Sequence, residues 1–262
     1  MPLGEEFLMA NPVFSFDEAR HLYRDAASIM RPSVSQILKA EGLISFDGIN
    51  PAVLEHKRRL GTLVHKVTEL YDQGEDLTQY EIPDEVWPYF DGWLNFRNDC
   101  KFTPRLIERQ ALVQVHGMWY GMKLDNEGPI NGEDNIIEKK CGSSRHPAWG
   151  VQLAGYDLGE AFLEKRLMPI IRPSRGRTVV QLGPQFARKY KTHPYTELSD
   201  YTVFVGSLAN ACWKINKNIP IFDNIPERID TTPGDSTPAQ SIAQPIVAVM
   251  DAPRELCEGV LQ

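Results

Sequence analysis

The sequence predicts an α/β fold in which helices flank one central mixed β-sheet. Two long segments with helical spacing of apolar residues precede three strand-like segments, and further helical and strand-like segments follow them. The 262 residues are enough for one large domain with additions. A hydrophobic content of 42% and a charged content of 24% are typical of a globular protein with a sizeable core.

The chain divides into three parts by composition. Residues 1–31 are expected to form an irregular or partly helical lead-in, and residues 32–218 to form the folded domain. Residues 219–262 are rich in proline and have little periodicity, so we expect an extended or disordered tail. Ser33 or Ser35 can cap a short helix at the start of the domain.

Helices and strands then alternate along the domain. Pro51 suits the first turn of a long helix over residues 51–73, and Gly61 inside it allows close approach of another backbone or a ligand. Further helices are expected over 84–100, 149–167 and 199–216. The strands are expected over 106–115, 118–125, 135–141, 178–182 and 191–197. The glycine- and asparagine-rich stretch 126–134 is expected to be a turn.

Asp125, Glu138 and Lys140 form the strongest chemical signal. Two adjacent antiparallel strands would bring Asp125 and Glu138 to one end of the sheet, and Glu138 and Lys140 would share a face. An isolated Glu-x-Lys is usually an exposed ion pair, but Ile136 and Ile137 directly before it indicate a buried strand. Paired carboxylates bind a hard divalent cation, which polarises a phosphate and activates water, while a lysine neutralises developing charge.

Charge and cysteine content limit the possible functions. The net charge of −7 argues against a protein that coats DNA non-specifically, but not against an enzyme with a local basic groove. The four cysteines are scattered, so neither zinc nor an iron–sulfur cluster nor a disulfide framework is expected. We expect a cytoplasmic protein, because the sequence shows no secretory signal and no apolar run long enough to span a membrane.

Several motifs in this order resemble the RecB-like exonuclease branch of the PD-(D/E)XK nuclease superfamily. The motifs are Asp125, the segment Ile136-Ile137-Glu138-Lys139-Lys140, the pair Gln152 and Tyr156 four residues apart, and Gly61-x-x-x-His65. The stretch Pro32 to Leu38 also resembles the lead-in of stand-alone, phage-type members. The resemblance covers roughly residues 32–215 and implies a restriction-endonuclease-like sandwich with a Mg²⁺- or Mn²⁺-dependent site.

The resemblance also implies a role for each matching residue. His65, Asp125, Glu138 and the backbone carbonyl of Lys139 would bind one or two metal ions, with Glu108 as a further candidate. Lys140 would be the catalytic lysine, and Gln152 and Tyr156 would position DNA or that lysine. Lys139 replaces a commonly apolar residue, and its side chain should point to the opposite face, toward a helix end or solvent. The candidate DNA contacts are Arg58, Lys66, Arg145 and Trp149.

The function expected from these residues is metal-dependent hydrolysis of DNA. The first hypothesis is an exonuclease that acts on DNA ends or single strands in recombination, repair or phage DNA metabolism. An endonuclease of the same fold, in defence or restriction, and a non-catalytic DNA-binding module are the alternatives. A recombinase or a single-strand-binding protein is a candidate partner for the proline-rich tail.

Overall fold

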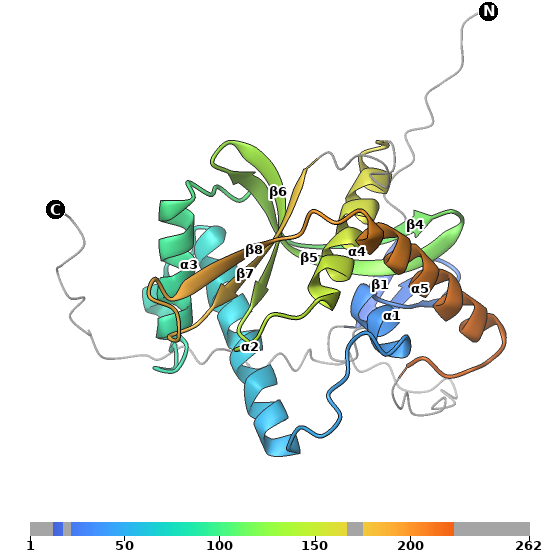
Figure 1. Ribbon diagram of the computed structural model, residues 1–262, viewed down its shortest axis with the longest axis horizontal. Coiled ribbons are helices and arrows are strands. Elements are labelled where there is room, and N and C mark those ends of the chain that lie inside the picture. Colours follow the sequence, from blue (N-terminus) through green and yellow to red (C-terminus); the bar gives the residue numbers. More distant parts are fainter. Residues whose placement is uncertain (1–12, 18–21, 167–174, 223–262) are drawn as a thin grey trace, which may run out of the picture.

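A computed structural model describes residues 13–17, 22–166 and 175–222 of the chain. Its central sheet has five strands in the order β4-β5-β6-β7-β8, which is also their order in the sequence (Figure 1). The strands are β4 (Leu106–Val115), β5 (Met118–Ile130), β6 (Glu133–Lys140), β7 (Gly176–Leu182) and β8 (Tyr190–Pro194). Strands β6 and β7 run parallel, and the other neighbouring pairs are antiparallel. The predicted mixed sheet is therefore confirmed.

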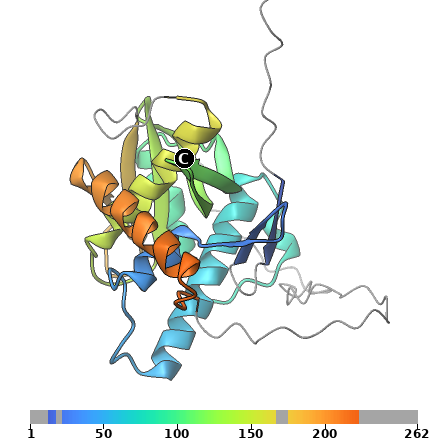
Figure 2. The ribbon, with the colours of Figure 1, turned by 90° about the vertical axis from the view of Figure 1, so that its right-hand side faces the viewer.

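Helices cover both faces of this sheet. On one face lie α2 (Pro51–Asp72) and α3 (Trp87–Asp99), and on the other α4 (Ala148–Leu163), with α1 (Val34–Ala40) and α5 (Ser199–Asn216) packed against α4 (Figures 1 and 2). Each face has its own apolar core. The α/β class with flanking helices, as the sequence predicts, is thus observed.

Helix α4 connects the two parallel strands of the sheet. Parallel neighbours need a crossover, and α4 provides it between β6 and β7. The helix is hydrophobic almost all round because it is held between the sheet and α5, and every residue from Ala148 to Ala161 is buried. It begins after the loop of residues 141–147, which follows the strand that carries Glu138 and Lys140, so α4 lies next to the candidate site.

The start of the domain agrees with the capping signals in the sequence. The Ser33 hydroxyl accepts the backbone N–H of Gln36, and the Gln36 side chain accepts the N–H of Ser33, which together form a capping box at α1. Asn50 caps α2 through its side chain, and Pro51 occupies the first turn, as predicted. No helix in the described part of the chain is long and apolar enough to cross a membrane.

The predicted turn over residues 126–134 is wrong. Strand β5 continues to Ile130, and the reversal is a tight turn at Asn131 and Gly132, which both have positive φ. Asn126 and Glu127 at the start of this stretch are buried within the sheet, where Asn126 donates to Asp72 and Glu127 pairs with arginines. Asparagine and glutamate therefore mark buried polar networks here and not a loop.

The expectation of an irregular or helical lead-in is also wrong for the described residues. A second sheet is formed by β1 (Phe14–Asp17), β2 (Leu22–Asp25) and β3 (Met30–Arg31). It is attached to the main sheet through Tyr23, whose ring packs on Gly121 and whose hydroxyl donates to the carbonyl of Met122. The predicted division into lead-in, domain and tail stays a prediction, and residues 223–262 lie outside the described residues.

Candidate active site

The β5–β6 ladder stops at Asn126, the residue after Asp125, and this interruption creates the site. The two strands pair from Ile130 and Glu133 to Asn126 and Ile137. Beyond that point the Asp125 carboxylate takes the place of a backbone partner, because its Oδ2 accepts the N–H of Lys139 at 2.7 Å. Asp125 therefore lies inside the sheet, next to the strand that carries Glu138, as the sequence predicts.

A second irregularity lies opposite Asp125 on β4. Glu108 has a φ of 47°, a left-handed conformation that is unfavourable for a glutamate. Alternate residues of a regular strand share a face, yet Leu106 packs against the α4 core and Arg109, three residues later, binds Glu160 of α4. The conformation of Glu108 interrupts the alternation of side chains along β4. It directs the Glu108 carboxylate toward the same histidine, His65, that the Asp125 carboxylate contacts.

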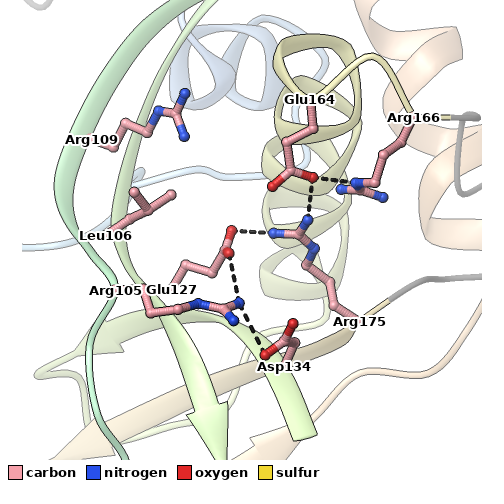
Figure 3. Close-up of a pocket in the computed structure, with 8 residues that line it drawn as sticks. All are labelled: Arg105, Leu106, Arg109, Glu127, Asp134, Glu164, Arg166 and Arg175. Carbon is pink, nitrogen blue, oxygen red and sulfur yellow. Dashed lines mark hydrogen bonds and ion pairs between the residues drawn. The ribbon is translucent and has the colours of Figure 1, made fainter.

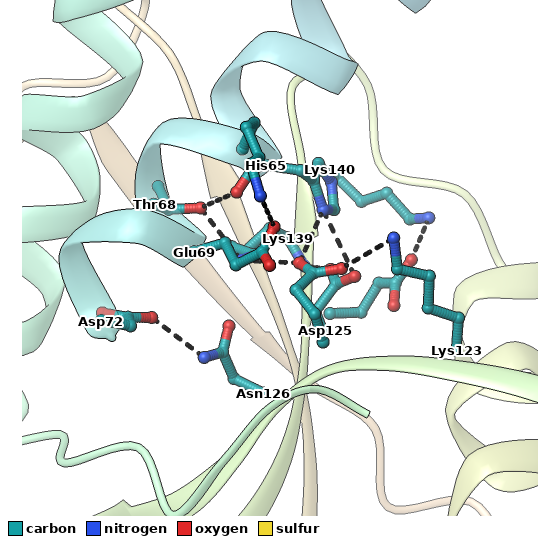
Figure 4. A network of polar contacts seen from close by, with 12 residues as sticks. His65, Thr68, Glu69, Asp72, Lys123, Asp125, Asn126, Lys139 and Lys140 are labelled. Carbon is teal, nitrogen blue, oxygen red and sulfur yellow. Dashed lines mark hydrogen bonds and ion pairs between the residues drawn. The ribbon is translucent and has the colours of Figure 1, made fainter. Parts of the chain in front are cut away.

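Helix α2 brings His65 to these two carboxylates (Figure 4). Its Nδ1 lies 3.3 Å from Oδ1 of Asp125 and 3.5 Å from Oε1 of Glu108. Burial lowers the pKa of His65, but the Asp125 carboxylate and both hydrogen bonds outweigh it and raise the pKa to about 9. Burial likewise raises the pKa of Asp125, but His65 and Lys139 bring it below its usual range. In the metal-free site, a proton on His65 balances the neighbouring carboxylates.

Glu138 and Lys140 form a second group on the α4 side of the sheet. The Nζ of Lys140 lies 2.6 Å from Oε1 of Glu138, and the same oxygen accepts a hydrogen bond from Gln152 at 2.8 Å. The Gln152 amide also donates to the Tyr156 hydroxyl at 2.9 Å. Burial and the Asp125 carboxylate raise the pKa of Glu138 to about 7, while Lys140 partly opposes them. The structure thus brings Glu138, Lys140, Gln152 and Tyr156 together.

The residues present fit a divalent cation. Oε2 of Glu138 is buried and has no hydrogen-bond partner among the described residues, which is costly unless a ligand satisfies it. Asp125 keeps Oδ1 on the side of His65, and His65, Glu108 and Asp125 each offer an atom within 4.8 Å of the others. Carboxylate oxygens are the preferred ligands of Mg²⁺ and Mn²⁺.

A second group of carboxylates fits a cation much less well. Glu127, Glu160 and Glu164 also offer atoms within 4.8 Å of one another, beside a pocket of about 520 Å³ at the far end of α4 (Figure 3). Arg175, however, binds both Glu127 and Glu164, and Arg109 binds Glu160. Guanidinium groups already neutralise these carboxylates, so the group forms an ion-pair network and not an open metal centre.

The predicted DNA contacts have different environments. Arg58 is exposed and lies over the ring of Phe46, and Lys66 is half-exposed and pairs with Glu69 at 3.1 Å. Arg145 is exposed and lies over the ring of Tyr195. Trp149 is only 9% exposed because it packs in the core of the α4 side. The burial of Trp149 argues against its predicted contact with DNA.

The sequence reasoning missed three polar neighbours of the site. Thr68 lies one turn after His65 on α2, so helical spacing could have identified it. Lys123 lies two residues before Asp125, and its Nζ is 3.3 Å from Oε2 of Glu108. No sequence pattern identifies Asp72, because its contacts with Trp93 and Asn126 form only when α2, α3 and β5 pack together.

The fold and the site define a class of protein: an α/β chain whose central sheet carries a buried carboxylate pair, a histidine and a lysine. Neither a family model nor a curated protein sequence matches the chain. Among the solved structures that are similar to this chain, three each match 72% of it. They are the protein SSO0001 (14% identity, 85% of that chain, TM-score 0.32), the exonuclease LHK-Exo in complex with dAMP (10%, 89%, 0.34), and the alkaline exonuclease LHK-Exo from Laribacter hongkongensis (10%, 92%, 0.32). Scores this low establish neither a family nor an activity for this chain.

Proposed function

We propose that this protein is a nuclease that uses Mg²⁺ or Mn²⁺ to hydrolyse phosphodiester bonds in DNA. One observation carries the proposal: the buried Oε2 of Glu138 has no partner and lies in the same group as the Lys140 ammonium. A buried carboxylate oxygen without a donor suits a cation ligand, and an adjacent lysine suits a phosphate oxygen. The resemblance to RecB-like exonucleases agrees with this chemistry.

The residues of the chain divide the work between binding and charge stabilisation. Asp125, Glu138, His65 and the backbone carbonyl of Lys139 would hold the ion, which, when bound, polarises the phosphate and activates water for attack. Lys140, whose side chain is 25% exposed, can reach from Glu138 to a phosphate oxygen and stabilise the charge that develops there. Gln152 donates to Glu138 and thereby fixes the orientation of that carboxylate.

The shape and charge of α2 support DNA as the substrate. The first half of the helix projects beyond the other elements (Figure 1), and residues 55–59 are all exposed. Its sequence there includes Lys57, Arg58 and Arg59, and the same helix carries His65 into the site. A DNA strand that follows these cations would lead its backbone to the carboxylates. We propose DNA ends or single strands as the preferred substrate.

End-labelled single- and double-stranded DNA with Mg²⁺ or Mn²⁺ tests the proposal. We expect cleavage by the unmodified chain and a loss of at least about 100-fold in rate for Asp125→Asn and for Lys140→Met, since removing one charge-stabilising group costs that much. Lys217→Met, an exposed lysine at the end of α5, is the matched control and should keep full activity. Unchanged melting temperatures would show that the variants are folded.

The same assay separates the competing functions. An exonuclease degrades linear DNA and leaves a covalently closed circle intact, whereas an endonuclease also cuts the circle. A non-catalytic binding module would retard DNA in a gel and cut none of these substrates with either ion. Absence of cleavage on every substrate, with a folded protein and bound metal, would contradict the proposal.

A further inference from the structure

Lys139 is fully buried on the α2 side of the sheet, opposite Glu138 and Lys140. Its Nζ donates to the Thr68 hydroxyl at 3.0 Å and lies 3.3 Å from Oε1 of Glu108 (Figure 4). The ammonium also lies over the ring of Trp93, 5.3 Å from its centroid. The expected change of face is observed, but neither a helix end nor solvent receives the charge. A buried ammonium is costly unless it is paired, so these contacts fix it in place.

Glu108 is the partner of this buried ammonium, and both of its oxygens have lysine partners. Oε1 faces Lys139 at 3.3 Å, and Oε2 faces Lys123 at 3.3 Å. The Glu138 carboxylate differs, because its Oε2 has no partner at all. Glu108 therefore has a lysine at each oxygen, whereas Glu138 has Lys140 at Oε1 and keeps Oε2 open.

We propose that the Lys139 ammonium acts as a built-in cation that keeps Glu108 from ligating metal, so that the site binds a single divalent ion. This inference rests on the proposed function and specifies its metal requirement. The ion would be held by His65, Asp125 and Glu138, and Glu108 would serve to hold Lys139. Lys139 is thus a positioning residue through its side chain.

Charge explains why a second ion is disfavoured. A second ion on Glu108 would lie beside an ammonium group that is 3.3 Å from the same carboxylate, and like charges at such distances repel strongly where water is excluded. The Lys139 ammonium contacts Thr68 and Trp93, and its side chain has no exposed surface that would let the charge reach solvent. The geometry alone would allow Glu108 to share an ion with His65 and Asp125, so the two arrangements need a measurement.

The inference is tested by the number of Mn²⁺ ions bound per chain. Electron paramagnetic resonance measures the free Mn²⁺, and the bound ion is the difference from the total; calorimetry is a second readout. We expect one ion per unmodified chain, and one ion in Glu108→Gln, because Glu108 is not a ligand. Lys139→Met should gain a second, weaker ion, and the double variant Lys139→Met/Glu108→Gln should return to one. Lys217→Met is the matched lysine control and should bind one ion.

Two ions of comparable affinity in the unmodified chain, or loss of binding in Glu108→Gln, would overturn the inference. A folded Lys139→Met that still binds one ion would overturn it as well. If Lys139→Met does not fold, the unmodified chain and Glu108→Gln decide alone. Asp125→Asn separates the two proposals: if it still binds the ion as tightly as the unmodified chain, the metal site of the proposed function fails, whatever the count.

Discussion

At the scale of single residues, two buried glutamates have a similarly raised pKa but different partners. Burial raises the pKa of Glu138 to about 7 with help from Asp125, and burial raises that of Glu160 to about 7 with help from Glu127 and Glu164. Glu138 has an oxygen open to a cation beside Lys140, whereas Glu160 is tied to Arg109 inside an ion-pair network. A raised pKa by itself therefore does not identify a functional carboxylate.

Glu160 makes stability depend on pH. Its pKa in the folded chain, about 7, lies above the usual 4.5, so its contribution to stability is complete below about pH 4.5 and is lost as pH rises through 7. Glu160→Gln should therefore raise the melting temperature at pH 8 and leave it nearly unchanged at pH 4.5.

Thermal unfolding of both proteins at several pH values measures this effect. Each unit of pKa shift corresponds to about 1.4 kcal/mol, so a difference of a few degrees at pH 8 is expected. Glu164→Gln is a suitable comparison, because Glu164 is partly exposed and its pKa is lowered by Arg166 and Arg175 against the effect of burial. An equal gain in melting temperature at both pH values would contradict the assignment to Glu160.

At the scale of elements, two glycines inside regular secondary structure differ in the space around them. Gly61 in α2 has no atom within 4 Å of the place where a Cβ would be, so the predicted close approach of another group is not observed. At Gly121 in β5 a Cβ would lie 2.1 Å from the ring of Tyr23. This contact holds the N-terminal sheet against the main sheet, and it tolerates no side chain.

Alanine at these two positions should change stability in opposite directions. Gly61→Ala should stabilise the protein by about 0.5–1 kcal/mol through helix propensity. Gly121→Ala should destabilise it by about 1–3 kcal/mol, because Tyr23 is buried and bonded to Met122 and has little room to move. Denaturant unfolding of the two variants checks both values. A destabilised Gly61→Ala would mean that α2 contacts another group at this position.

At the scale of the whole molecule, the net charge of −7 conceals a local basic region. The exposed half of α2 carries Lys57, Arg58 and Arg59, although the chain as a whole is acidic. DNA binding should therefore be weak at high salt and should depend on few phosphate contacts. Arg59 is partly engaged by Glu85 at 3.0 Å, so Arg58 is the better test of phosphate binding.

Arg58→Ala should weaken the binding of all DNA sequences equally, because a phosphate contact does not distinguish bases. The slope of log affinity against log salt should fall by about 0.7–0.9, which corresponds to one phosphate contact. Fluorescence anisotropy with labelled DNA at several salt concentrations measures the slope. Lys217→Ala on α5 serves as the control, and an equal loss in that variant would show that α2 is not the DNA-binding element.

The sequence by itself determined much of the architecture. Helix α5 has the predicted bounds because its apolar residues follow one helical period from end to end, and strand β4 has them although its alternation is reset at Glu108. Strand spacing predicts that Glu138 and Lys140 share a face next to Asp125. The resemblance to RecB-like nucleases adds Gln152 and Tyr156, which the structure places beside them. Their roles in catalysis remain predictions.

Only the tertiary structure decided which charges meet across elements. The neutralisation of Glu108 by Lys123 and Lys139, the buried network of Asp72, and the burial of Trp149 depend on how α2, α3 and α4 pack on the sheet. These contacts join residues far apart in the chain, and no local period encodes them. Asn126 by itself would favour a loop. It lies in a strand because Asp72, on another element, accepts its hydrogen bond in the interior.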